Sequence, residues 1–281
     1  MNQSFNFSRW RMLVALHWVE NRKRYGLALL AMGGLLCAWF GFIISIDRFA
    51  PMDSFYQYSA YYAGLYFVGC LYASTTFSEL GSRAKGIQWL SVPASHLEKL
   101  LCGLFFNIVL FFIAYTLVFY LVDIPMVKLA SHIIVREHRV IPGTTKLIGE
   151  MEVFRISGGN RLGFSDDDFY TFLLGFFAAQ SAFILGSVYF TRYVFIKTTI
   201  AVLLMILITT IFIMRVVKGN IPAGWRLNDL EEWVRAEGMS APTALVRLPS
   251  WMETTGMYLV RYSAPFIFWF ITYFRLKEKE V

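Results

Sequence analysis

The sequence has little charge, and it lacks the short motifs of the common soluble enzymes. Only 16% of its 281 residues are charged and 57% are apolar, whereas ordinary soluble domains contain about 25% charged residues. No GxxxxGK[ST], HExxH or GxSxG pattern occurs. We therefore expect neither an enzyme nor a P-loop ATPase, and the apolar excess is too large for one soluble core.

Cysteine is scarce, and metal-ligating side chains do not cluster. Cys37, Cys70 and Cys102 lie in apolar runs without a CxxC pattern, so we expect unpaired thiols. The three consecutive acids at 166–168 suit the start of a helix, whose dipole they complement, and a metal site there is the alternative. We expect no cofactor or metal bound by this chain.

The apolar residues form long runs, which is the pattern of a polytopic all-α membrane protein. A span needs about 20 mostly apolar residues because the hydrocarbon layer is about 30 Å thick. The sixth run is the weakest because it contains Arg261 and Pro265. The sequence predicts six transmembrane helices, at about 25–46, 55–77, 100–122, 169–190, 194–217 and 258–274.

The first 24 residues mix tryptophan, aliphatic and basic side chains and end in the cluster Arg22, Lys23 and Arg24. This composition predicts an amphipathic interfacial helix on the cytoplasmic side, and a frayed polar leader is the alternative. We expect the first span to act as its own insertion signal. The formal charge of +7 is explained by basic residues beside the spans, so a lipid bilayer is expected as partner and nucleic acid is not.

Two segments are longer than helix connections need to be. With both termini cytoplasmic, as the short basic segments favour, the segments 123–168 and 218–257 are extracytoplasmic loops. The first contains β-branched runs within 127–156, which predict a small β element. The second contains a predicted amphipathic stretch at 227–236. By contrast, 191–193 is a tight basic turn that predicts a helical hairpin.

The polar segment 78–99, between the second and third predicted spans, is the most distinctive part of the sequence. We expect Pro93 to open a helix there, with Ser91 or Ser95 satisfying exposed backbone groups. A capped interfacial loop without a partner is the alternative. The segment resembles the signature of permease subunits of type-2 ATP-binding-cassette transporters, a phenylalanine-led polar turn followed by Leu-Pro-Ala-Ser-x-x-Glu-Lys. Val92 stands where leucine is usual, and the matching residues are Phe77, Leu80, Pro93, Ala94, Ser95, Glu98 and Lys99.

The resemblance implies a transporter, most simply an exporter of the bacterial cytoplasmic (inner) membrane that works by alternating access. It implies a separate cytosolic ATP-binding-cassette ATPase, which would bind ATP and Mg, and a second permease copy or a related permease in a dimer. The residues expected to couple the ATPase to the membrane helices are Glu79, Arg83, Trp89, Pro93, Ser95, Glu98 and Lys99.

Polar side chains within the predicted spans are candidates for a translocation path. These are Tyr62, Asn107 and Arg261. Each has an alternative: an aromatic belt or helix packing for Tyr62, an interhelical hydrogen bond for Asn107, and contact with outer headgroups for Arg261. A second function stays open at this point, a membrane-anchored binding or sensory protein that acts through its external loops.

Overall fold

The computed structural model describes residues 5–46, 54–81, 86–87, 92–136, 153–154, 166–220 and 250–279. Within these ranges every regular element is a helix, as the sequence predicts. The elements are α1 (Phe7–Ile46), α2 (Ser54–Thr75), the 3-10 turn η1 (Ser78–Gly81), α4 (His96–Leu104), the π-helix η2 (Phe105–Leu110), α5 (Phe111–Arg136), α6 (Asp166–Tyr189), α7 (Val194–Asn220) and α9 (Ser250–Lys279).

Several apolar helices mark this chain as membrane-embedded. Among the described residues, four helices are long and apolar enough to cross a membrane, at Phe7–Ile46, His96–Ile133, Phe169–Tyr189 and Val194–Phe212. The helices α2 and α9 match the second and sixth predicted spans but are not among these four. Six tyrosines lower the hydropathy of α2, and α9 carries charges at both ends. Six spans therefore stay a prediction.

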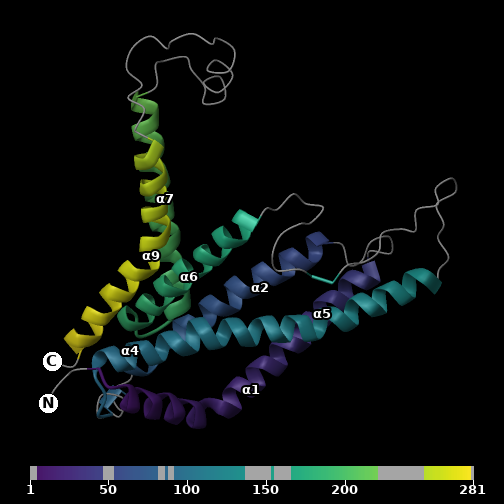
Figure 1. The fold of residues 1–281 in the computed structure, drawn as a ribbon, viewed down its shortest axis with the longest axis horizontal. Coiled ribbons are helices and arrows are strands. Elements are labelled where there is room, and N and C mark those ends of the chain that lie inside the picture. Colours follow the sequence, from purple (N-terminus) through teal and green to yellow (C-terminus); the bar gives the residue numbers. More distant parts are fainter. Residues whose placement is uncertain are drawn as a thin grey trace.

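The predicted N-terminal helix and the first predicted span form one continuous helix of 40 residues, at 7–46. At about 1.5 Å per residue, such a helix is roughly twice as long as the hydrocarbon layer is thick. Its first half therefore extends outside the apolar layer, and Figure 1 shows α1 changing direction along its course. The basic cluster Arg22 to Arg24 interrupts the apolar run but not the helical backbone.

The helix that contains the third predicted span is longer than predicted, and part of the predicted β element is wrong. The helix does not end at Val122 but continues through Asp123 and Pro125 to Arg136. The β-branched run 132–135 is thus helical, because α5 buries Val127 and Ala130 against other helices, and such packing overrides local propensity. The remaining parts of the predicted β element, except Val153 and Phe154, lie outside the described residues, as do the stretch 227–236 and most of both predicted loops.

The helices form two neighbouring groups, which meet where α2 contacts α5 and where α4 contacts α9. Helix α1 packs along α4 and α5, whereas α6 packs against α2, α7 and α9. The α6–α7 hairpin predicted from the turn 191–193 is confirmed. It is closed by Tyr193, which has a φ of 55°, and Gly186 of α6 lies so close to Thr198 of α7 that an added Cβ would stand 2.0 Å from the threonine Oγ1.

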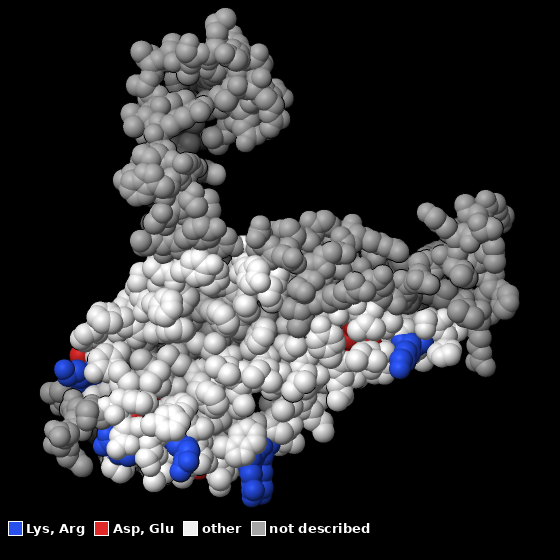
Figure 2. Space-filling model, viewed as in Figure 1, with Lys and Arg blue, Asp and Glu red and all other residues white. Residues whose placement is uncertain are grey.

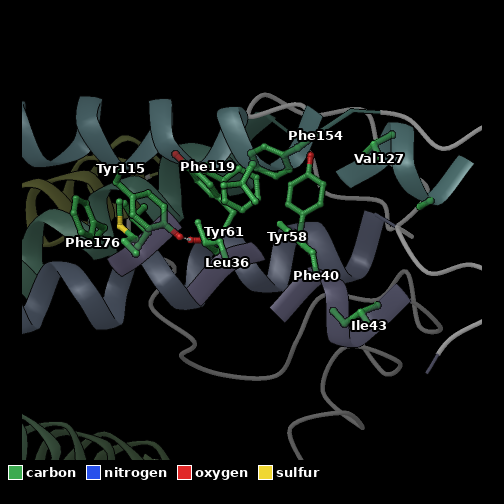
Figure 3. Close-up of a cluster of buried hydrophobic side chains, with 14 residues drawn as sticks. Leu36, Phe40, Ile43, Tyr58, Tyr61, Tyr115, Phe119, Val127, Phe154 and Phe176 are labelled. Atoms are coloured by element: carbon green, nitrogen blue, oxygen red, sulfur yellow. Dashed lines mark hydrogen bonds between the residues drawn. The ribbon is translucent and has the colours of Figure 1, made fainter. Parts of the chain in front are cut away.

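An aromatic cluster fills the space between α1, α2 and α5 (Figure 3). Tyr61 of α2 lies at its centre, with ring centroids 5.0 Å from Phe119 and 4.7 Å from Phe154. The hydroxyl of Tyr115 crosses from α5 to donate a hydrogen bond to the backbone oxygen of Tyr61 at 2.8 Å. Tyr58 also belongs to this cluster, and Tyr56, Tyr62 and Tyr66 of α2 pack against it.

Candidate functional site

The start of α4 is built by a reciprocal cap. The Ser95 hydroxyl accepts a hydrogen bond from the Glu98 backbone N–H at 3.2 Å, and Glu98 Oε2 accepts one from the Ser95 N–H at 2.9 Å. This is a capping box, in which the serine and the glutamate stand three residues apart. The prediction that Ser95 satisfies exposed backbone groups is confirmed. The prediction that Pro93 opens the helix is wrong, because Pro93 lies in an exposed bend before the cap.

The second carboxylate oxygen of Glu98 binds the beginning of α1. Glu98 Oε1 accepts a hydrogen bond from the Asn6 backbone N–H at 2.7 Å and lies 3.0 Å from Nη2 of Arg9. The Glu98 side chain is fully buried, while Arg9 is 39% exposed. A buried carboxylate needs such compensation, because burying an unpaired charge is very costly. Glu98 therefore fixes the starts of two long helices to each other.

The beginning of α1 is itself ordered around this contact. The Asn6 side-chain oxygen accepts a hydrogen bond from the Ser8 N–H at 2.9 Å, which is the pattern of a helix N-cap. Further along α1, Trp10 packs edge-on against Phe105 with ring centroids 5.8 Å apart, and His17 lies 4.5 Å from the Phe106 ring. Sequence reasoning missed Asn6 and Arg9, because their role depends on a residue about 90 positions later in the chain.

Of the remaining predicted coupling residues, the structure describes some side chains and not others. Lys99 follows Glu98 and is also buried, with 4% of its side chain exposed. Glu79 belongs to η1, and nothing further is described for its side chain. Arg83 and Trp89 lie outside the described residues, so their coupling role stays a prediction. Phe77, the first residue of the signature, is buried, and its N–H donates to Ser187 Oγ of α6 at 3.3 Å.

Two of the predicted translocation residues, Tyr62 and Asn107, have described side chains, and these contact different parts of the chain. Tyr62 is half-buried on α2 and packs against Phe172 of α6, with centroids 4.8 Å apart. Asn107 lies in η2, 2% exposed, and its Nδ2 donates to the Gly103 backbone oxygen within its own helix at 2.8 Å. The alternative given for Asn107 was an interhelical hydrogen bond, whereas this bond is intrahelical. Arg261 belongs to α9, and its side chain is not described.

Asp123 is a buried polar residue that sequence reasoning took for the start of a loop. Its side chain has no exposed surface, and Oδ2 accepts a hydrogen bond from the Phe154 backbone N–H at 3.1 Å. The carboxylate thus holds the segment at 153–154 against the aromatic cluster. The available signal was an acid directly after an apolar run, which does not distinguish a helix end from a buried anchor.

Comparisons of the chain with protein-family models, with curated proteins and with solved structures find no match. What the fold and site define is thus a membrane-embedded helical chain in which a buried glutamate joins the start of α1 to the start of α4.

Proposed function

We propose that this chain is the membrane-spanning permease subunit of an ATP-driven transporter of the type-2 ATP-binding-cassette class. The observation that carries the proposal is the position of Glu98. It belongs to the signature that resembles such permeases, and its carboxylate contacts both the cap of α4 and the beginning of α1. In this role a separate ATPase pushes on the segment 78–99, and the permease changes shape in response.

The helical path from this segment supports such coupling. Helix α4 continues through η2 into α5 without a break in the helical backbone, from His96 to Arg136. A helix transmits displacement along its axis because its backbone hydrogen bonds are all internal. Movement at the Ser95 cap would therefore reach the far end of α5. It would also move α1, because Glu98 connects the two helices.

In this proposal the continuous helix from α4 to α5 bends at the π-helix η2. Residues 105–110 depart from α-helical hydrogen bonding, and such π-turns are frequently found at functional positions in helices. In the proposed cycle, α4 and the start of α1 move together, and η2 absorbs the change in direction relative to α5. We expect the partner to carry the P-loop that this chain lacks.

Co-purification tests the proposal directly. The tagged chain is isolated from its native membrane in mild detergent, and bound subunits are identified by mass spectrometry and assayed for ATP hydrolysis. We expect a stoichiometric P-loop ATPase, and we expect Glu98→Ala to reduce its recovery or its hydrolysis rate. Leu204→Ala, on the exposed face of α7, is the matched control and should change neither. Recovery of the intact chain with no ATP-hydrolysing subunit would contradict the proposal.

The second function, binding or sensing through the external loops, has one supporting observation. Phe154 is buried against Tyr58 and Tyr61 and is tied to Asp123, so this part of the first predicted loop is fixed to the helices. A ligand bound by that loop would thus have a route to α2 and α5. Replacing 137–152 by a short linker should abolish function under this alternative and should leave ATPase recovery unchanged under the first.

A further inference from the structure

A groove of about 190 Å³ lies between α6, α7 and α9, beside the turn that closes the α6–α7 hairpin. Its floor includes the buried residues Ala182, Gly186 and Thr198, and its rim includes the exposed residues Tyr189 and Ala201. The lining is almost wholly apolar. The groove is therefore open at its side and suits a hydrocarbon chain.

The groove lies inside the membrane-embedded part of the hairpin. The apolar stretch Phe169–Tyr189 ends at the hairpin turn and the stretch Val194–Phe212 begins there, so this turn lies at the membrane surface. The lining residues of α7 run from Thr198 to Met205, which is about 10 Å along the helix axis. The apolar molecules at this depth are lipid chains. An acyl chain that extends inward from the surface therefore fits the groove.

Two exposed cations lie at the surface end of the groove. Lys197 Nζ lies 5.8 Å from the centre of the Phe190 ring, and Phe190 lines the groove. Arg192 belongs to the hairpin turn, and its side chain is exposed. Within the described part of the chain, neither cation has a carboxylate at ion-pair distance. Two positive charges at this end are thus accessible and lack a counter-ion from the described residues.

The C-terminal end of α9 lies at the same membrane surface. The Arg275 guanidinium lies 4.8 Å from the centre of the Tyr189 ring at the rim of the groove, and its charge is balanced by Glu278. Figure 2 shows Lys and Arg side chains gathered along the edge of the molecule where both termini lie in Figure 1. Basic residues at a membrane surface attract anionic lipid headgroups. The charge at the open end of the groove therefore favours an anionic headgroup over a neutral one.

We propose that this groove holds one anionic phospholipid. An acyl chain fills the groove between α6, α7 and α9, and the phosphodiester faces Arg192 and Lys197, which offer it charged hydrogen-bond donors. Lipid binding here goes beyond the transport function and does not depend on an ATPase, because it involves only this chain and the bilayer around it. The basic turn at 191–193 then serves in lipid binding as well as in closing the hairpin.

Native mass spectrometry of the full chain, purified in mild detergent, counts the lipids that stay bound. Phosphatidylglycerol and phosphatidylcholine with the same acyl chains are compared, because they differ in net charge. We expect one retained phosphatidylglycerol per chain and about fivefold weaker retention after Lys197→Gln or Arg192→Gln, the effect of losing one basic residue at a membrane surface. Arg215→Gln, exposed near the other end of α7, is the matched control and should leave retention unchanged. Equal retention of the two lipids by the unmodified chain would overturn the proposal, as would equal losses with Lys197→Gln and Arg215→Gln.

The acyl chain gives a second readout that does not depend on charge. Ala201→Trp places an indole at the rim of the groove and should displace the bound lipid, whereas Leu204→Trp, on the same helix but outside the lining, should not. Equal retention in these two variants would contradict an acyl chain in the groove. Displacement of the lipid by millimolar glycerol phosphate, which has the charge but no chain, would identify a soluble anion as the ligand and overturn the proposal. A purified dimer that Ala201→Trp separates into monomers would overturn it by identifying a second copy as the occupant.

Discussion

The Glu98 carboxylate lies 3.0 Å from the Arg9 guanidinium, and this contact joins two helix beginnings that are separated by 89 positions in the sequence. The same carboxylate also receives the Asn6 and Ser95 N–H groups, so its charge is compensated by three donors. The pair is asymmetric, because Glu98 is fully buried and Arg9 is partly exposed. Its two members should therefore respond differently to mutation.

Glu98→Ala should lower the free energy of unfolding by about 2–3 kcal/mol, since hydrogen bonds to charged groups contribute roughly that much. Arg9→Ala should cost only about 1 kcal/mol, because Arg9 is partly solvated and the two backbone donors remain. Thermal or denaturant unfolding in detergent, followed by tryptophan fluorescence, measures both values. Equal effects of the two variants would mean that the backbone donors contribute nothing.

Ser95→Ala should destabilise the first turn of α4 by about 1 kcal/mol, the usual cost of removing a helix N-cap. Ser95→Asp should recover most of this loss, because an aspartate side chain also caps. Hydrogen exchange of the amides at 96–99 is the sharpest readout. Ser131→Ala is the control, since the Ser131 hydroxyl donates to the Lys128 backbone oxygen within α5 and caps nothing. Unchanged exchange in Ser95→Ala would show that the cap is dispensable.

The sequence predicts the membrane class and the Ser95 cap because both depend on local information. Long apolar runs are visible without any tertiary contact, and a capping box is a spacing of three residues. The continuity of α1 past Arg24 and of α5 past Asp123 could not be predicted in this way. Charge interrupts the apolar pattern at both places, and Asp123 is accommodated by an N–H from residue 154, 31 positions away.

The candidate site around Glu98 was predicted only in its α4 half for the same reason. Glu98 and Lys99 stand out through the signature, but the partner of Glu98 at Arg9 belongs to a segment that the pattern assigns to the membrane surface. A one-dimensional pattern contains no sign that residues 6–9 lie against residue 98. The hydrogen bond from Asn107 Nδ2 to the Gly103 backbone oxygen is likewise visible only in the folded chain.

Gly186→Ala should destabilise the α6–α7 hairpin by about 1–3 kcal/mol, as overpacking of a well-filled contact does. The added methyl group would stand 2.0 Å from Thr198 Oγ1 and 2.9 Å from Thr198 Cβ, so more than a side-chain rotation is needed. Gly34→Ala is the matched control in α1, because nothing lies within 4 Å of its added Cβ. Unfolding measurements on the two variants should separate them, and equal stability would contradict the close packing of α6 on α7.

Phe154→Ala should remove about 3 kcal/mol or more of stability, because it empties a buried aromatic position between Tyr61 and Phe119. Val153→Ala is the neighbouring control, since Val153 is 41% exposed, and it should have little effect. Limited proteolysis gives a second readout: the segment around 154 should be cut faster in Phe154→Ala than in the unmodified chain. Equal protection in both variants would show that Phe154 does not anchor this segment.

Site-specific photocrosslinking in the native membrane can show whether a separate ATPase acts on the segment before α4. A photoreactive amino acid replaces Ile87, which lies in that segment with 65% of its side chain exposed. In a second strain the same group replaces Leu204, on the exposed face of α7. We expect a crosslinked P-loop ATPase from position 87 and none from position 204. Correct insertion of the chain with no ATPase crosslinked at position 87 would contradict it.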